Sequence, residues 1–329
     1  MFLLLYSSFL GFFILPLLLL PPQAQTLITS SSYIGAVAQH AVYYGSSGSS
    51  SSSENNNSSE SLSELVDTNL YIYERMVRAA AENGAQIIVF PEFGLVPVKD
   101  DDRVAIGTIA EIIPDPDPDP DPDADRSSTT PCGNIAFTDR IILTRSSCVA
   151  QMYKILVMVN MVDWIDCDTS SDPSCPSDDH YQITTDVLFD ESGRIVAKYH
   201  KSHEWPGLMP LYDQPATPSR VTYTSSFGVV FGLFICFDIM FPDPPVALVD
   251  KGIKHFLYAV KQGLLGEETL ISSFSRRHNV TLLSANLASD LLVHDCSGVI
   301  VSGETLPHKK IFIGEDFPEE NVLLSVIQY

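Results

Sequence analysis

The chain has 329 residues, of which 45% are hydrophobic, and this is enough for one large α/β domain with a well-buried core. The formal net charge of −22 argues against nucleic acid as a partner, because phosphate binding needs clustered Lys and Arg and the sequence has no such cluster. Much of the acidity lies in loop-like segments, so it bears on solubility more than on the substrate.

The first 25 residues resemble a secretory signal peptide. The run from Phe2 to Leu20 is almost purely apolar and is followed by Pro21-Pro22-Gln23-Ala24-Gln25, a small and polar flank typical of a cleavage region. The basic residue that usually precedes such a run is missing. The alternative is an uncleaved signal anchor, because a run of this length can span a bilayer. We therefore expect a secreted protein that could associate with a membrane through such an anchor.

The cysteines agree with export. Six are present: Cys132, Cys148, Cys167, Cys175, Cys236 and Cys296. Cys167 and Cys175 bracket a polar loop, and Cys132 and Cys148 flank another segment, so we expect two disulfides. The remaining two thiols are left unpaired, which raises the question of reactivity. A zinc site is disfavoured, because there is no Cys-x-x-Cys and no His pair at ligand spacing.

The predicted elements begin with a strand over 33–44. The segment 45–63 is almost all Ser, Asn and Gly and reads as a low-complexity insert that cannot bury enough surface to order itself. It contains glycosylation sequons at Asn56 and Asn57, and a third stands at Asn279.

A helix and a buried strand follow this insert. Ser61 and Glu64 form a capping box, which predicts a helix from there to about Asn83. The apolar run 86–90 is then a buried strand that ends at Pro91. The order strand, helix, strand predicts a layered α/β architecture.

The segment 114–126 is a second low-complexity insert. It opens with successive Pro-Asp pairs, which prevent helix formation and predict a stiff, extended loop. A calcium site built from these carboxylates is disfavoured, because the ligands cannot easily converge.

The rest of the chain alternates helices and strands, and no internal repeat interrupts the pattern, so one domain covering 26–329 is the simplest organisation. The predicted helices cover 139–153, 243–251 and 267–277, and the predicted strands cover 154–160, 184–189, 195–198, 229–235, 256–260 and 280–285.

Three residues with reactive side chains stand at the ends of predicted strands. Glu92 follows Ile-Ile-Val-Phe-Pro, Lys201 follows Val-Ala-Lys-Tyr-His, and Cys236 follows Phe-Gly-Leu-Phe-Ile. Ligand sites in α/β proteins lie at strand ends. Taken singly, each residue has a simpler explanation as a solvated carboxylate, a surface lysine or a core thiol.

Taken together, these motifs resemble the nitrilase superfamily and, within it, the pantetheinase–biotinidase (vanin) branch. Phe-Pro-Glu at 90–92 matches the element that carries the catalytic Glu of this family, and Tyr-His-Lys at 199–201 matches the element that carries its Lys. Ile-Cys-Phe-Asp-Ile-Met-Phe at 235–241 matches the element that carries its nucleophile. The resemblance covers roughly residues 33 to 325.

The resemblance implies an α-β-β-α sandwich and hydrolysis of a linear amide, with pantetheine-like or biotinyl amides as the expected small-molecule substrates and no cofactor. Cys236 would attack as a thiolate, Glu92 would serve as general base, and Lys201 would stabilise the oxyanion. The resemblance assigns no catalytic role to His200 or His203, which we expect to be structural.

This assignment makes two predictions about the reactive groups. The side chains of Glu92, Lys201 and Cys236 should converge within about 3–5 Å of one another. The thiolate of Cys236 should be more available than that of Cys296, because an ammonium group neighbours the first and the carboxylate of Asp295 neighbours the second.

The chain also departs from the branch. A second Glu usually follows the Lys, and at the branch position this chain has Leu208, so Glu204 is the candidate substitute. The branch segment Pro-Thr-x-Trp near the pocket corresponds here to 257–260, and the C-terminal β-rich domain of the branch has no counterpart. The chain is thus either a single-domain relative or part of a longer protein.

These departures support an alternative function, in which the chain keeps the fold but acts as a secreted, non-catalytic binding or scaffold module. The presence of Glu92, Lys201 and Cys236 opposes it. The sequence leaves the substrate and the oligomeric state open, a homo-oligomer included.

Overall fold

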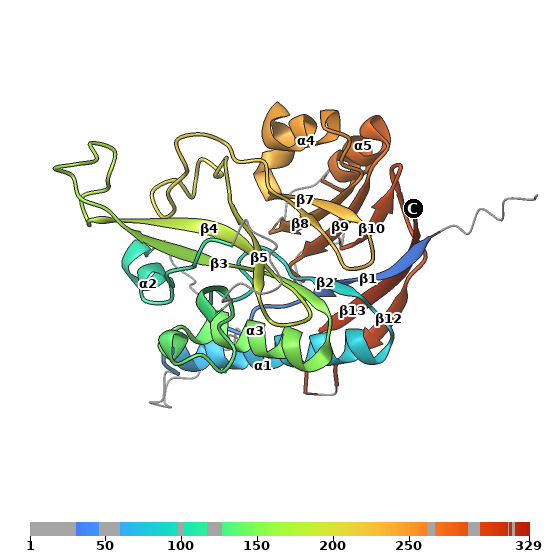
Figure 1. Ribbon diagram of the computed structural model, residues 1–329, viewed down its shortest axis with the longest axis horizontal. Coiled ribbons are helices and arrows are strands. Elements are labelled where there is room, and N and C mark those ends of the chain that lie inside the picture. Colours follow the sequence, from blue (N-terminus) through green and yellow to red (C-terminus); the bar gives the residue numbers. More distant parts are fainter. Residues whose placement is uncertain are drawn as a thin grey trace, which may run out of the picture. The chain divides into compact units, whose positions relative to one another are not determined.

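The computed structural model describes residues 31–45, 60–97, 102–116, 127–261, 267–288, 297–314, 316–317 and 320–329 (Figure 1). The predicted signal peptide, the sequons at Asn56 and Asn57, and Cys296 lie outside these ranges. Within them, no helix is both long enough and apolar enough to cross a membrane.

Two β-sheets form the centre of the fold. The seven-stranded sheet has the order β12-β13-β1-β2-β3-β4-β5. Its strands are β1 (Ser32–Gln39), β2 (Ile87–Val89), β3 (Leu156–Asp166), β4 (His180–Phe189), β5 (Ile195–His200), β12 (Lys309–Phe312) and β13 (Asn321–Gln328). The six-stranded sheet has the order β11-β10-β9-β8-β7-β6. Its strands are β6 (Thr222–Thr224), β7 (Val230–Ile235), β8 (His255–Val260), β9 (Thr281–Asn286), β10 (Gly298–Val301) and β11 (Glu304–Thr305).

Strand direction places the ends of several strands at one edge of each sheet. β1, β2 and β3 are parallel, and β5 runs in the same direction because it is antiparallel to β4, which is antiparallel to β3. β7, β8 and β9 are parallel in the other sheet. The residues that directly follow β2 and β5 therefore emerge at the same edge of the first sheet, as those that follow β7 and β8 do in the second.

Helices cover the outer faces of the two sheets (Figure 1). α1 (Leu62–Glu82) and α3 (Ile141–Tyr153) lie on the seven-stranded sheet, and α4 (Ala247–Asp250) and α5 (Glu267–His278) lie on the six-stranded sheet. The order helices, sheet, sheet, helices confirms the predicted α-β-β-α sandwich. Shorter helical elements are α2 (Arg103–Gly107), the 3₁₀ turns Ser127–Thr129, Ile135–Phe137 and Cys236–Met240, and the wider turn Pro242–Val246.

The core follows from the apolar pattern of these elements. In α1, Leu70, Tyr73, Val77 and Ala80 recur at helical spacing and are buried against the first sheet, and the predicted capping box at Ser61 is formed. Between the sheets, one continuous cluster joins side chains of both: Val37, Val89 and Met158 from the first, and Leu233, Leu257 and Leu283 from the second. This cluster fixes how the two sheets pack and hence how their strand ends meet.

Two disulfides close loops in the middle of the chain. Cys132 is bonded to Cys148, with 4.8 Å between the Cα atoms, and Cys167 is bonded to Cys175, with 5.8 Å. Both pairings confirm the prediction. Disulfides of this kind are typical of proteins that fold in oxidising, extracellular compartments.

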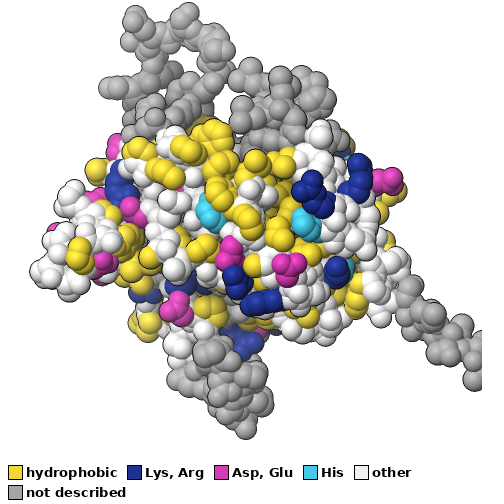
Figure 2. Space-filling view, turned by 90° about the horizontal axis from the view of Figure 1, so that it is seen from above, with side chains coloured by type: hydrophobic (Ala, Val, Ile, Leu, Met, Phe, Trp, Pro, Cys, Tyr) yellow, Lys and Arg dark blue, Asp and Glu magenta, His cyan; other side chains and the backbone are white. Residues whose placement is uncertain are grey.

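The structure differs from the sequence prediction after β7. The predicted helix over 243–251 is reduced to α4, because Asp243 has extended backbone angles (φ −119°, ψ 126°) and precedes a proline, which disfavours helical geometry. β1 ends at Gln39, before the predicted end at Tyr44. On the face in Figure 2, acidic and basic side chains are interspersed among hydrophobic ones.

Candidate active site

Three strand ends bring the candidate catalytic residues together. Glu92 follows β2, Lys201 follows β5, and Cys236 begins the turn after β7. Glu92 and Lys201 are each 1% exposed, and Cys236 is 6% exposed. Lys201 Nζ donates to Glu92 Oε1 at 2.6 Å, and the charges of Glu92 and Lys201 both act on the Cys236 thiol. The structure thus places the three side chains in one buried cluster.

The carboxylate of Glu92 is held at both oxygens. Oε1 accepts the hydrogen bond from Lys201, and Oε2 accepts one from the backbone N–H of Lys261 at 3.1 Å. Lys261 directly follows β8, and its carbonyl oxygen lies 3.9 Å from the Cys236 sulfur. One backbone segment therefore contacts both the carboxylate and the thiol, which fixes their relative position.

The thiol stands on a constrained turn. Cys236 has φ +44°, a left-handed conformation that costs a non-glycine residue of the order of 1 kcal/mol. Two hydrogen bonds hold it: Tyr258 donates to the carbonyl of Cys236 at 2.8 Å, and the N–H of Ile235 donates to Asp238 Oδ2 at 3.0 Å. The N–H of the next residue, Phe237, lies at the start of this helical turn, where it lacks an intrahelical acceptor.

Asp238 connects this turn to the segment that carries Lys201. Its Oδ2 also accepts from the hydroxyl of Tyr199 at 2.7 Å. Its Oδ1 accepts from the N–H of His203 at 2.9 Å and lies 2.9 Å from Nδ1 of the same residue. Asp238 is fully buried and thus links the residues on either side of Lys201 to the Cys236 turn. We did not single out this role in the sequence, although Asp238 lies within the nucleophile motif.

Glu204 is the second carboxylate at Lys201. Its Oε1 accepts from Lys201 Nζ at 2.5 Å and from the N–H of Trp205 at 2.9 Å, and its Oε2 accepts from Thr184. Burial raises the pKa of Glu204, and the charge of Lys201 opposes that rise. The residue proposed as a substitute for the missing second Glu thus contacts the lysine, whereas Leu208 packs in an apolar cluster.

A buried relay supports the backbone next to Glu92. Phe93 has φ +58°, and its N–H donates to Asn160 Oδ1 at 3.0 Å. Asn160 Nδ2 in turn donates to Asp186 Oδ1 at 2.8 Å. Burial raises the pKa of Asp186 well above its ordinary range, and the hydrogen bond from Asn160 opposes the rise. These two polar residues lie inside apolar strands and were not predicted as part of the site.

The resting charges follow from this environment. Burial raises the pKa of the Cys236 thiol well above its ordinary value, and the charge of Glu92 adds to the rise, while Lys201 opposes it. The predicted comparison of this thiol with that of Cys296 stays a prediction, because Cys296 lies outside the described residues. Burial alone would lower the pKa of Lys201, but Glu92 and Glu204 raise it, so the lysine stays charged.

The two histidines near Lys201 are engaged elsewhere. His200 Nε2 lies 2.7 Å from Asp163 Oδ2, and His203 stacks on Phe241 with 3.8 Å between the ring centres. Both histidines therefore contact groups other than Cys236. Within the described ranges, no group of three or more His, Cys, Asp or Glu side chains is arranged to hold a metal ion.

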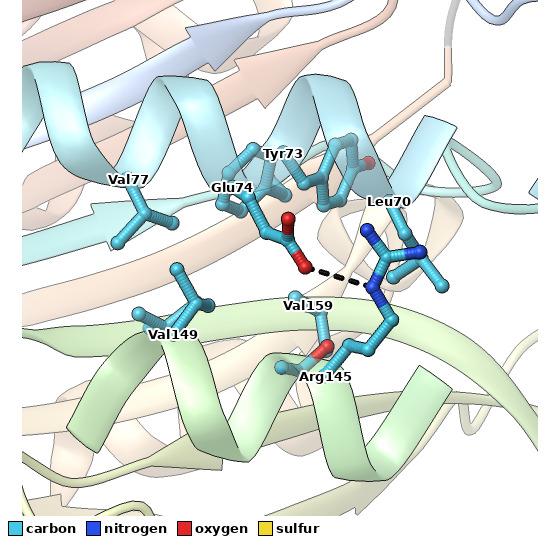
Figure 3. Close-up of a pocket in the computed structure, with 10 residues that line it drawn as sticks. Leu70, Tyr73, Glu74, Val77, Arg145, Val149 and Val159 are labelled. Carbon is cyan, nitrogen blue, oxygen red and sulfur yellow. Dashed lines mark hydrogen bonds and ion pairs between the residues drawn. The ribbon is translucent and has the colours of Figure 1, made fainter. Parts of the chain in front are cut away.

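A separate, small gap lies between α1, α3 and the outer face of the first sheet (Figure 3). Leu70, Tyr73 and Val149 line it, and the ion pair between Arg145 Nε and Glu74 Oε1, at 2.7 Å, lies beside it. None of the three candidate catalytic residues lines this gap, so it is a packing feature of the helical layer rather than part of the site.

Comparisons with known proteins agree with this geometry. The profile of the carbon-nitrogen hydrolase family matches residues 59–281. Biotinidase of Takifugu rubripes is 35% identical over 73% of this chain and 46% of its own length. Pantetheinase of Homo sapiens is 39% identical over 58% of this chain and 35% of its own. The chain thus spans about half the length, or less, of these curated relatives.

Solved structures support the fold. An amidase from Nesterenkonia sp. is 18% identical, with a TM-score of 0.58 over 92% of each chain. A cysteine-to-alanine mutant of the Nesterenkonia AN1 amidase, of the nitrilase superfamily, is 17% identical, with a TM-score of 0.59 over 92% of this chain and 93% of that one. At this identity the likeness concerns the fold alone.

Proposed function

Because the chain belongs to the carbon-nitrogen hydrolase family, we propose that it hydrolyses a linear amide bond of a small molecule, with Cys236 as nucleophile. The observation that carries this proposal is the buried cluster in which the carboxylate of Glu92 contacts the ammonium of Lys201, while the backbone of Lys261 contacts both that carboxylate and the thiol of Cys236. Amide hydrolysis needs a nucleophile, a proton carrier and a fixed positive charge, and the cluster provides one of each.

Acylation begins with proton transfer. Since the resting thiol is protonated, Glu92 accepts its proton as the sulfur attacks the amide carbonyl and the carbon–sulfur bond forms. The negative charge moves to the carbonyl oxygen, where Lys201 and the backbone N–H of Phe237 stabilise it. A fixed donor of this kind typically contributes about 3–4 kcal/mol to transition-state stabilisation.

The tetrahedral intermediate then collapses. The carbon–nitrogen bond breaks, Glu92 returns its proton to the leaving amine, and a thioester remains on Cys236. Glu92 next takes a proton from water, whose oxygen attacks the thioester, and the carboxylic acid leaves while the thiol is restored. Each proton that Glu92 accepts is returned, so the cycle consumes one water and needs no further reactant.

Lys201 serves as a fixed cation in this mechanism. Its ammonium lies between Glu92 and Glu204, at 2.6 and 2.5 Å, and these contacts limit its rotation. The two carboxylates also keep it charged throughout. Glu204 would therefore do in this chain what the second Glu of the family does, from a position closer to the lysine in the sequence.

The substrate class follows from the relatives. They include a biotinidase and a pantetheinase, so biotinyl amides and pantetheine-like amides are the first candidates. The divergent segment 257–260 is fully buried in β8, between β7 and β9, and its Tyr258 hydroxyl supports the Cys236 turn. Its altered residues therefore bear on the position of the nucleophile as well as on the shape of the pocket.

We also propose that the protein is secreted. The apolar leader and the two disulfides support this location. The alternative of a non-catalytic scaffold loses its main argument, since Glu204 supplies the second carboxylate that appeared to be missing.

The test is hydrolysis by the purified full chain. Release of the amine is measured with pantetheine, biotinyl-lysine and simple aliphatic amides, and a stopped reaction is digested to look for an acyl group on the peptide that contains Cys236. We expect turnover of at least one of these amides and a mass increase on that peptide alone. An acyl adduct on a different residue, or folded protein with no turnover of any amide, would overturn the proposal.

A further inference from the structure

Lys261 is placed at the reacting groups by its own backbone. Its N–H donates to Glu92 and its carbonyl oxygen faces the sulfur of Cys236, at 3.1 and 3.9 Å. The register of the parallel strands β7 and β8 causes this, because Ile235 pairs with Ala259 and both strands end at the same edge. The side chain of Lys261 therefore starts beside the carboxylate of Glu92 and the thiol of Cys236.

This side chain ends over an aromatic ring of the site. Its Nζ lies 5.1 Å from the ring centre of Phe93, the residue after Glu92. Nζ of Lys201 lies 5.8 Å from the same centre. Phe93 is 3% exposed, whereas Lys261 is exposed. The ammonium of Lys261 thus lies at the solvent side of the ring, next to the buried cluster, instead of extending away from the protein.

The two ammonium groups differ in their partners. Lys201 is paired with two carboxylates, whereas Lys261 forms no ion pair with any residue in the described part of the chain. The chain has 41 acidic residues against 19 basic ones, so an unpaired cation beside a reaction centre is not explained by the overall composition. Such a cation favours the approach and binding of an anionic group.

We propose that Lys261 forms a subsite for an anionic group, a carboxylate, of the amide substrate. This inference rests on the proposed function and narrows its substrate class to amides that carry a carboxylate near the scissile bond. In this subsite the exposed ammonium of Lys261, held over the ring of Phe93, pairs with the carboxylate.

The substrate side of the test is a matched pair of amides. N-hexanoyl-β-alanine carries a carboxylate on its leaving amine, and N-hexanoyl-3-aminopropan-1-ol is similar in size but neutral. The measured quantity is the ratio of kcat/KM for the charged amide to that for the neutral amide. We expect Lys261→Met to lower this ratio about 3–10-fold, chiefly through KM, in the range of a partly exposed ion pair.

Two further variants sharpen the result. Lys261→Arg should keep the ratio, because it keeps the charge, and Lys261→Glu should lower it further. Lys310→Met is the matched control: Lys310 also lies over an aromatic ring, that of Phe312 at 5.7 Å, but on β12. Its ratio should equal that of the wild type. Added salt should reduce the wild-type ratio and have less effect on Lys261→Met.

Binding without turnover separates this inference from the proposed function. In titration calorimetry with N-hexanoyl-β-alanine, the double variant Cys236→Ser/Lys261→Met should bind this amide more weakly than Cys236→Ser alone. If both amides lose activity equally in Lys261→Met, the lysine acts on the reacting groups rather than on the substrate, and the subsite is refuted. An unchanged ratio together with unchanged binding refutes it as well. A wild-type protein that binds the charged amide through Lys261 but hydrolyses neither amide refutes the proposed function and leaves the subsite standing.

Discussion

Strand β5 lies between two clusters of charged residues. Lys198 and His200 point to one side and contact Asp163, whereas Tyr199 points to the other and contacts Asp238, next to the buried Lys201 cluster. This division follows from the two-residue period of a strand. A single short strand therefore separates one charge cluster from the other.

The two clusters differ in how their charges are balanced. Asp163 accepts from a backbone N–H, lies at hydrogen-bond distance from His200, and receives Lys198, which also reaches the exposed Asp115. On the other face, one ammonium is shared by two buried carboxylates, and burial and the charge of Glu92 raise the pKa of the nearby Cys236 thiol. The first arrangement reaches the surface through Asp115, whereas the second is buried and includes a nucleophilic side chain. The two clusters therefore differ in burial and in the presence of a thiol rather than in the number of their charges.

The largest expected effect is on the thiol and its proton acceptor. Cys236→Ser and Glu92→Gln should each lower kcat by at least about 10⁴-fold, because one removes the nucleophile and the other cannot take up its proton. The measurement is amine release under saturating substrate, with circular dichroism to show that the fold is kept. Cys296→Ser, which alters the other cysteine outside the two disulfides, is the control and should keep full activity. Comparable activity in Glu92→Gln would remove the base from the mechanism.

The next largest effect is expected from replacing Lys201, which directly follows β5, and the same change at Lys198 within β5 is its comparison. Lys201→Met should lower kcat about 10²–10³-fold, since a fixed oxyanion donor is lost, whereas Lys198→Met should change kcat less than about threefold. Lys201→Met should also cost about 3–5 kcal/mol of unfolding free energy, because two buried carboxylates lose their cation. Denaturant titration and kinetics on the same samples measure both.

A double variant tests this interpretation of Lys201. Adding Glu204→Gln to Lys201→Met removes one of the two stranded charges, so it should recover part of the lost stability and none of the lost kcat. Recovery of activity would show that the lysine acts through Glu204 and not on the oxyanion.

The sequence predicted the strand ends that carry the cluster because each is preceded by a buried apolar run that has a local signature. The runs 86–90 and 229–235 correspond to β2 and β7, and the motif residues follow them directly. The resemblance to the nitrilase superfamily then indicated that the three motifs belong to one active site. Glu204 could be named from its spacing to Lys201, although the contact itself depends on the backbone turn after β5.

The supporting residues could not be predicted in the same way. Asn160 and Asp186 lie inside apolar strands, and their link to Phe93 joins positions 67 and 26 residues apart. β13 was missed because its role depends on antiparallel pairing with β1, at the other end of the chain. Such contacts arise from the packing of distant segments, which leaves no periodic signal in a single sequence.

A smaller effect is expected on the structural face of β5. Asp163→Ala should cost about 2–4 kcal/mol of unfolding free energy, because the N–H of Ile113 and the imidazole of His200 lose their buried partner, whereas Lys198 keeps the carbonyl of Ile113. Its kcat should stay within about threefold of the wild type. Asp115→Asn is the control, since Asp115 is 86% exposed and such a surface pair contributes less than about 1 kcal/mol. A large loss of kcat in Asp163→Ala would mean that the two faces of β5 are coupled.

The smallest effect concerns Glu111, whose backbone pairs with β3 on both sides of Asp163. Its carboxylate accepts from the N–H groups of Ile142 and Leu143 at the start of α3, at 2.7 and 2.9 Å. Burial raises the pKa of Glu111 from 4.5 to about 7, although these hydrogen bonds oppose the rise. Between these two pH values the folded chain binds more protons at this site than the unfolded chain, so its contribution to stability is present below about pH 4.5 and is lost as the pH rises through 7.

The full shift would correspond to about 3 kcal/mol at most, at about 1.4 kcal/mol per pKa unit. Glu111→Gln keeps a neutral acceptor at the start of α3 and cannot ionise. The unfolding free energy of the wild type should therefore fall more steeply from pH 5 to pH 8 than that of Glu111→Gln, as measured by urea titration at each pH. The kcat of the two proteins should follow the same pH profile, because Glu111 lies outside the Lys201 cluster. Parallel stability curves would show that Glu111 is already ionised in the folded protein, and a changed kcat profile would place it in communication with Glu92.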